Sequence, residues 1–186
     1  MILDNKQKNL LEFVKVKHGD QVRKYTGEPY WTHVVGVAEI VWAYDRRGIE
    51  VALCHDLYED TDCTFSMLYK CLTETCGYMS SESYDICTLV TDLTDVFTKE
   101  DYTYMNRKKR KQKEAERLGT IGYLSQTVKY ADLIHNTKSI VEHDKGFAKV
   151  YLHEKQEILV HMDNGNADLY ARCVDLLNNE IENLNK

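Results

Sequence analysis

Residues 51–62 read VALCHDLYEDTD, an apolar turn followed at once by a histidine and four carboxylates. The pattern predicts a helix from about Ile49 to Asp60. Surface helices carry acids, but they do not usually lead into them from an apolar run. This stretch therefore predicts a polar pocket that is cut into the core of a helical protein.

Residues one turn apart on a helix share a face, so we expect His55 to lie over Glu59 and Asp56 to lie over Asp60. Adjacent residues differ by about 100° around the helix, and the four groups should line one broad arc. Buried charges need partners or a metal ion. A divalent cation would compensate several carboxylates at once.

The composition predicts an all-α protein. The chain has 186 residues, 43% of them hydrophobic, with one proline and nine glycines. Few helix breakers over this length favour long helices. We predict a single domain, residues 1–186, built as a bundle of roughly nine helices without a convincing strand.

The remaining helices are predicted from apolar periodicity and from capping residues. Their predicted spans are about 4–18 ending at Gly19, Thr32–Arg47, Ser66–Cys76 closed by Gly77, Ser81–Leu93, a helix from the Thr98–Asp101 capping box to Leu118, Thr120–His143, Phe147–Met162 and Ala167–Leu184.

Charge and cysteine usage restrict the compartment and the partners. The net charge of −6 makes a nucleic-acid partner unlikely. No signal peptide is evident in residues 1–18, and no apolar run reaches the ~20 residues that span a membrane. Six cysteines without a CxxC pair fit free thiols in a reducing cytoplasm. The oligomeric state, monomer or homodimer, stays open.

A metal ion needs more ligands than His55 and Asp56. His33 lies 22 residues before His55, and Asp132 lies far downstream in VKYADLIHNT. Such a mixed set suits Mn²⁺, Zn²⁺ or Fe²⁺. Glu59 and Asp60 would then orient or deprotonate a water. The commonplace alternative is a set of exposed polar residues around a satisfied core histidine.

Four stretches carry a family resemblance, and they stand in the family's order and spacing: RKYTGEPYWTHVVGVAEI (23–40), ALCHDLYEDTD (52–62), LVTDLTD (89–95) and VKYADLIHNT (128–137). The chain resembles the HD-domain metal-dependent phosphohydrolases of the RelA/SpoT type, most closely the stand-alone small alarmone hydrolases of the Mesh-like group. The resemblance covers a core of about residues 8–162, followed by a C-terminal helix at 166–185. Val34 departs from the proline that often follows the first histidine.

The resemblance implies a role for each matching residue. The implied metal ligands are His33, His55, Asp56 and Asp132, usually for Mn²⁺, and the implied catalytic pair is Glu59 and Asp60. The implied contacts to a small nucleotide substrate are Arg23, Lys24 and Asn136. The implied reaction splits the 3′-pyrophosphate from ppGpp or pppGpp and leaves GDP or GTP.

The basic cluster RKKRKQK at 107–113 offers further cations. Its ordinary interpretation is a solvated helix face. As a functional site, Arg107 or Lys108 would reach the polyphosphate.

Two other functions remain open. The same chemistry could act on another nucleotide: NADPH, a nucleoside monophosphate, a deoxynucleotide or a cyclic dinucleotide. The chain could also be a non-catalytic nucleotide sensor, although a binder need not keep a water-activating acidic pair.

Overall fold

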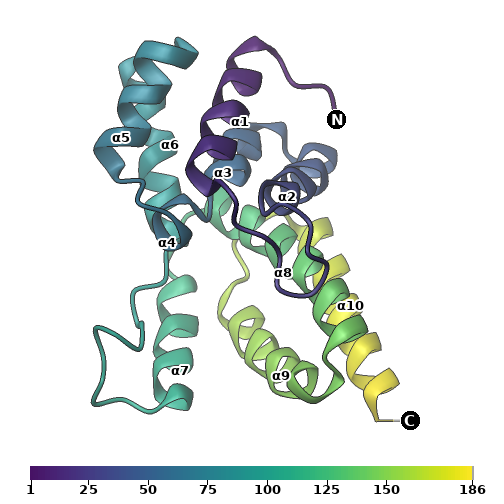
Figure 1. Cartoon of the computed structure of the whole chain (residues 1–186). Coiled ribbons are helices and arrows are strands. Elements are labelled where there is room, and N and C mark those ends of the chain that lie inside the picture. The colour runs from purple at the N-terminus through teal and green to yellow at the C-terminus, as the bar shows by residue number, and fades with distance from the viewer. Residues whose placement is uncertain (186) are drawn as a thin grey trace. The chain divides into compact units, whose positions relative to one another are not determined.

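The computed structural model describes residues 1–185, which form helices joined by turns and by two longer loops at 19–30 and 94–106 (Figure 1). Within this range no strand occurs, and one isolated bridge joins Val22 to Pro29. The predicted all-α class is confirmed, with ten α-helices, one 3-10 helix and one π-helix in the described part. The chain divides into two compact units, Met1–Thr94 and a second that begins at Asp95.

The first unit holds the purple-to-teal helices of Figure 1. Its elements are α1 (Asn5–His18), α2 (Trp31–Tyr44), the 3-10 helix η1 (Arg46–Gly48), α3 (Ile49–Cys54), α4 (Leu57–Asp60), α5 (Phe65–Lys70), the π-helix η2 (Cys71–Cys76) and α6 (Ser80–Leu93). Helix α3 packs against α1, α2 and α6. Five of its six residues are buried, all except Glu50, so the apolar lead-in of the opening motif is core, as predicted.

Helix ends in this unit follow local chemistry. The Asp4 side chain caps α1 by accepting a hydrogen bond from the Gln7 N–H, and Gly19 is the C-cap at the other end of the helix. Gly77 ends η2 in the left-handed region at φ 76°, which glycine adopts without strain. Helix α2 is shorter than predicted because Asp45 turns to extended backbone and its carboxylate starts η1.

The second unit contains α7 (Arg107–Leu118), α8 (Tyr123–His143), α9 (Lys145–His161) and α10 (Ala167–Leu184). The predicted 167–184 helix is confirmed at both ends. Helix α8 packs against α9 and α10. At the α9–α10 link a Cβ on Gly165 would collide with the Tyr130 ring, so glycine permits this close approach.

The expected helix from residue 98 to 118 is wrong in its first part. The Asp101 N–H donates to the Thr98 hydroxyl oxygen as in a capping box, but the Asp101 carboxylate accepts from the Thr98 hydroxyl and not from its backbone N–H. The two residues close a turn, and α7 begins only at Arg107, after the cap Asn106. No helix in the described range is both long and apolar enough to cross a membrane.

Candidate metal centre

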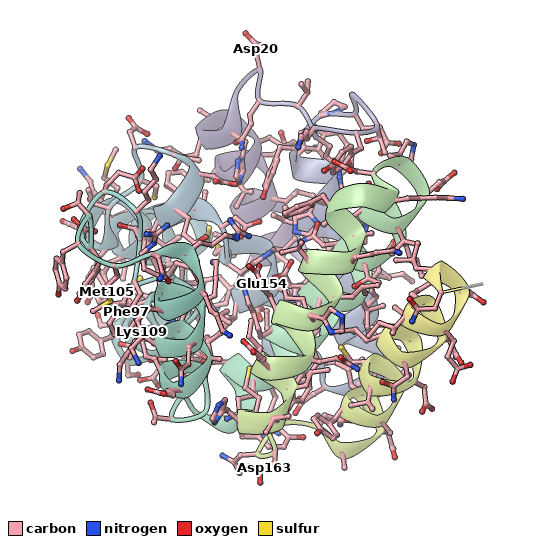
Figure 2. The ribbon with its side chains drawn as sticks, turned by 90° about the horizontal axis from the view of Figure 1, so that it is seen from below. Asp20, Phe97, Met105, Lys109, Glu154 and Asp163 are labelled. Atoms are coloured by element: carbon pink, nitrogen blue, oxygen red, sulfur yellow. The ribbon has the colours of Figure 1, made fainter. Side chains whose placement is uncertain are left out.

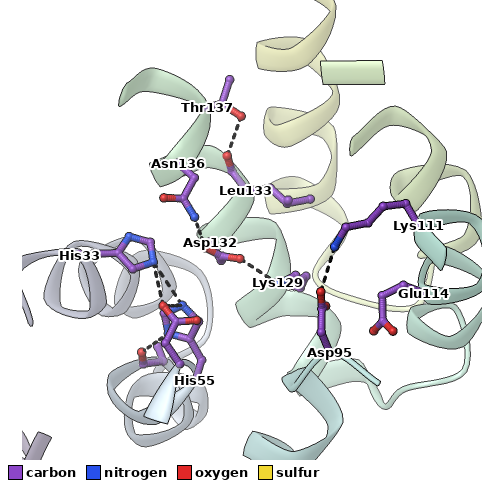
Figure 3. A network of polar contacts seen from close by, with 12 residues as sticks. His33, His55, Asp95, Lys111, Glu114, Lys129, Asp132, Leu133, Asn136 and Thr137 are labelled. Carbon is purple, nitrogen blue, oxygen red and sulfur yellow. Dashed lines mark hydrogen bonds and ion pairs between the residues drawn. The ribbon is translucent and has the colours of Figure 1, made fainter. Parts of the chain in front are cut away.

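Two buried histidines of the first unit face one another (Figure 3). His33 lies in the first turns of α2, and His55 directly follows α3. Their side chains are 2% and 1% exposed, and their Nε2 atoms lie 3.3 Å apart. The packing of α2 on α3 thus joins residues that lie 22 positions apart.

The predicted continuous helix through this motif is wrong, and the interruption shapes the site. Helix α3 ends at Cys54 and α4 begins at Leu57. Asp56 lies between them with φ −98° and ψ 0°. In a regular helix the side chains of His55 and Asp56 would point about 100° apart. Here Asp56 Oδ2 lies 3.1 Å from His55 Nε2 and 3.4 Å from His33 Nε2.

Hydrogen bonds at Nδ1 distinguish the two rings. His55 Nδ1 lies 2.8 Å from the Ala52 carbonyl oxygen. A carbonyl only accepts, so this nitrogen carries a proton and Nε2 keeps its lone pair for a metal ion. His33 Nδ1 lies 3.3 Å from Arg23 Nη1, which is a donor. That contact favours the other tautomer in His33.

The Asp56 carboxylate is held ionised by its neighbours. Burial alone would raise its pKa, but when the His55 and His33 rings are protonated, their positive charge and hydrogen bonds outweigh burial and lower the pKa. The Tyr30 hydroxyl donates to Asp56 Oδ2 at 2.7 Å. The Tyr30 ring stacks on His18 with centroids 4.8 Å apart, and this contact fixes the direction of the hydroxyl.

The two acids after Asp56 lie at the solvent side of α4. Glu59 and Asp60 are exposed, whereas Leu57 of the same short helix is fully buried. Gln21 Nε2 donates to Asp60 Oδ2 at 3.3 Å. An exposed acidic pair directly after a buried ligand set is placed to meet water.

The second unit contributes a buried carboxylate on α8. Asp132 is 5% exposed. Its Oδ1 accepts from Asn136 Nδ2 at 2.7 Å, and its Oδ2 pairs with Lys129 Nζ at 3.0 Å (Figure 3). All three residues lie within seven positions of one helix, and their i,i+3 and i,i+4 spacing brings them together. Asp132 and Asn136 therefore share one face of α8 and are joined by a hydrogen bond.

The other predicted substrate residues lie in different surroundings. Lys24 is exposed, with Nζ 3.2 Å from the Tyr25 hydroxyl oxygen. Arg107 makes a bidentate ion pair with Glu154 at 2.7 and 2.9 Å, and Figure 2 marks Glu154 on α9. Lys108 is exposed and borders a surface hollow between α7 and α9.

Sequence reasoning missed two residues that contact the predicted ligands, one in each unit. Nothing in PYWTH indicates that the Tyr30 hydroxyl donates to Asp56. Lys129 carried a usable signal, because a lysine three residues before an aspartate on a helix commonly pairs with it.

The donor chemistry fits a divalent transition metal. His33 and His55 belong to a set of buried side chains that could hold a metal ion. Two imidazole nitrogens beside an ionised carboxylate suit Mn²⁺, Zn²⁺ or Fe²⁺. The His55 proton on Nδ1 is the arrangement that such a ligand needs.

Comparison with known proteins identifies similar hydrolases. No family model matches the chain. It is 28% identical over 135 residues to guanosine-3′,5′-bis(diphosphate) 3′-pyrophosphohydrolase MESH1 of Drosophila melanogaster, and 27% to MESH1 of Danio rerio. Each alignment covers 70% of this chain and 66% of the relative.

A bacterial protein and a solved structure extend the comparison. The guanosine-3′,5′-bis(diphosphate) 3′-pyrophosphohydrolase of Aquifex aeolicus (strain VF5) is 50% identical over 56 residues, which are 29% of this chain and 8% of that protein. A structure described as "A metazoan ortholog of SpoT hydrolyzes ppGpp and plays a role in starvation responses" has a TM-score of 0.77 and 22% identity, covering 96% of this chain and 97% of the other. The chain spans just under two thirds of the MESH1 relatives. These findings confirm the predicted fold and the resemblance to the Mesh-like group.

Proposed function

We propose that this chain is a metal-dependent guanosine 3′,5′-bis(diphosphate) 3′-pyrophosphohydrolase, which converts ppGpp or pppGpp and water to GDP or GTP and pyrophosphate. The observation that carries the proposal is the convergence of His33, His55 and Asp56 on one point. The names of the similar proteins supply the substrate. Under this proposal both units belong to one catalytic domain.

We propose His33, His55, Asp56 and Asp132 as the metal ligands and Mn²⁺ as the ion. The first three meet within one unit, as described above. Asp132 is supported by its burial and by its place in VKYADLIHNT. A divalent ion held by these residues would stabilise negative charge on phosphate oxygens and lower the pKa of a water.

The chain's own residues then carry the proton and position the substrate. Glu59 and Asp60 are exposed carboxylates, able to align the attacking water and accept its proton. When the water attacks the 3′ phosphorus, the electrons of the broken O3′–P bond leave on the ribose 3′ oxygen, which must gain a proton. Arg23 and Lys24 would offset phosphate charge, and Asn136 would contact the nucleotide.

The proposed cellular location rests on the free state of the cysteines. Cys54, Cys63, Cys71, Cys76, Cys87 and Cys173 are free. We propose a reducing cytoplasmic location on this basis.

The test is ppGpp hydrolysis with and without added Mn²⁺, beside metal analysis of the purified protein. Asp56→Ala should lose metal and turnover together. Glu59→Gln should keep metal and lose much of the rate. Asp85→Asn, which alters an exposed carboxylate on α6 of the same unit, is the matched control and should behave as wild type.

Two results would contradict the proposal. Wild-type turnover by Glu59→Gln would remove its assigned role. Tight ppGpp binding by a metal-loaded protein without pyrophosphate release over hours would identify a sensor. A parallel panel of NADPH, nucleoside monophosphates, deoxynucleotides and cyclic dinucleotides, read by product chromatography, would reveal a different nucleotide substrate.

A further inference from the structure

Two thiols of the first unit touch each other away from the histidine pair. Cys71 and Cys76 are the first and last residues of η2, and their Sγ atoms lie 3.8 Å apart. Each residue is 5% exposed. The hydrolytic mechanism uses neither of them.

The π-helical form of η2 is what brings these thiols together. In an α-helix, residues i and i+5 lie about 8.6 Å apart at Cα, from a rise of 1.5 Å and a turn of 100° per residue. A disulfide needs a Cα separation of about 4.4–6.8 Å. A π-helix joins i and i+5 by its backbone hydrogen bond, which brings them to about 6 Å, the separation of hydrogen-bonded residues in an α-helix. The local backbone of residues 71–76 is thus suited to a disulfide that a regular helix would forbid.

The two thiols are hydrogen-bonded to each other, and either sulfur can be the donor. That bond lowers the pKa of the thiol that accepts it, so one member of the pair ionises more readily than the other. Next to the pair, α1 and η2 enclose a surface hollow of about 300 Å³. Its lining residues are Asn9, Glu12, Phe13, Val16, Cys71 and Thr75. A small reagent can therefore approach the pair from solvent.

We propose that Cys71 and Cys76 form a dithiol that is reversibly oxidised to an intramolecular disulfide by exchange with a low-molecular-weight disulfide such as oxidised glutathione. The thiolate of one cysteine of the pair attacks one sulfur of the reagent, and the other sulfur leaves as a thiolate. The thiolate of the second cysteine then attacks the protein sulfur of the mixed disulfide and expels the second thiolate. The chain loses two electrons and two protons, and the reagent is reduced to two thiols.

The test treats the full chain with oxidised glutathione and reads the intact mass. Wild type should lose two hydrogens and retain no adduct, and dithiothreitol should restore the original mass. Cleavage at Glu74, which lies between the two cysteines, should leave two fragments that separate only after reduction.

Variants make the assignment specific. Neither Cys71→Ser nor Cys76→Ser should lose two hydrogens, because each variant lacks one of the two sulfurs that the ring requires. Cys87→Ser removes a fully buried thiol of α6 and should oxidise as wild type does. The proposal is overturned if the wild-type protein forms no disulfide or keeps the glutathione adduct without closing the ring. It is also overturned if the Cys71→Ser variant still loses two hydrogens. A disulfide between Cys87 and either residue would overturn it as well.

Discussion

Replacing Tyr30 by phenylalanine should weaken metal binding while it leaves the fold intact. The substitution removes the hydroxyl that donates to Asp56 Oδ2 at 2.7 Å and keeps the ring that stacks on His18. Burial, followed by the carboxylates of Asp56 and Asp60, raises the pKa of Tyr30 far above the neutral range. The hydroxyl is therefore a permanent donor at any working pH.

The size of the effect follows from the charge on the acceptor. A hydrogen bond to a charged group contributes about 1.5–3 kcal/mol. Each 1.4 kcal/mol corresponds to about a tenfold change in an equilibrium constant. We therefore expect Mn²⁺ binding to weaken about ten- to a hundredfold, the range typical of residues that orient metal ligands.

The assay is a calorimetric Mn²⁺ titration of wild type and Tyr30→Phe, with urea unfolding of both proteins. Tyr78→Phe is the matched control, because the Tyr78 hydroxyl also donates to a carboxylate of the first unit, Glu50, at 3.0 Å. It should lose a similar amount of stability and keep wild-type metal affinity. If Tyr30→Phe binds Mn²⁺ as tightly as wild type, or more tightly, Tyr30 does not orient Asp56 but competes with the metal ion for the same oxygen.

Three further predictions concern the second unit and are read by urea unfolding. Gly165→Ala should destabilise the protein by about 1–3 kcal/mol, because the new methyl group meets the Tyr130 ring; no loss would show that the α9–α10 link can shift freely. Glu114→Gln should cost about 1.5–3 kcal/mol through its lost charge interaction with Arg117, whose Nε donates to it at 2.8 Å; an unchanged midpoint would contradict this. Burial and then the neighbouring lysine amines lower the pKa of Lys155 from 10.5 to about 8. Between these two pKa values the folded state therefore binds fewer protons than the unfolded state, so the free energy of unfolding should rise with pH from about 8 to 10.5. The Lys155→Met variant should show a flatter rise. An equal rise in the variant would refute the assignment to Lys155.

Periodicity predicted most helices because the sequence repeats the same local signal through each of them. The 167–184 helix and the end of η2 at Gly77 were predictable from an asparagine cap, apolar spacing and a glycine. The segment 95–106 was not, because distant contacts determine it. The Glu114 carboxylate accepts from the N–H groups of Val96 and Phe97 at 3.1 Å each, across a separation of 17 to 18 residues. A capping pattern cannot show that such an anchor exists.

The candidate site was predictable in its residue types and not in its geometry. Histidine beside aspartate after an apolar run indicated buried ligands, and both are largely buried. The break between α3 and α4 at His55 and Asp56 could not be predicted from the sequence, because both residues keep near-helical backbone angles. A modest change of φ and ψ there turns two neighbouring side chains toward one point.

The Nδ1 contacts of the two histidines favour different tautomers, and under the proposed function this difference would link metal binding to substrate binding. The Ala52 carbonyl already sets the His55 tautomer that a ligand requires. If His33 binds a metal ion through Nε2 as a neutral ring, its proton must be on Nδ1. Nδ1 lies 3.3 Å from Arg23 Nη1, which is also a donor. The two N–H groups would repel each other, so under the proposed function a metal ion at His33 would displace the Arg23 side chain. Under the proposed function, that displacement releases a cation in the loop that precedes the first ligand, where phosphate charge has to be neutralised. Binding of the metal and of the polyphosphate should then favour each other, because linkage between two sites is reciprocal.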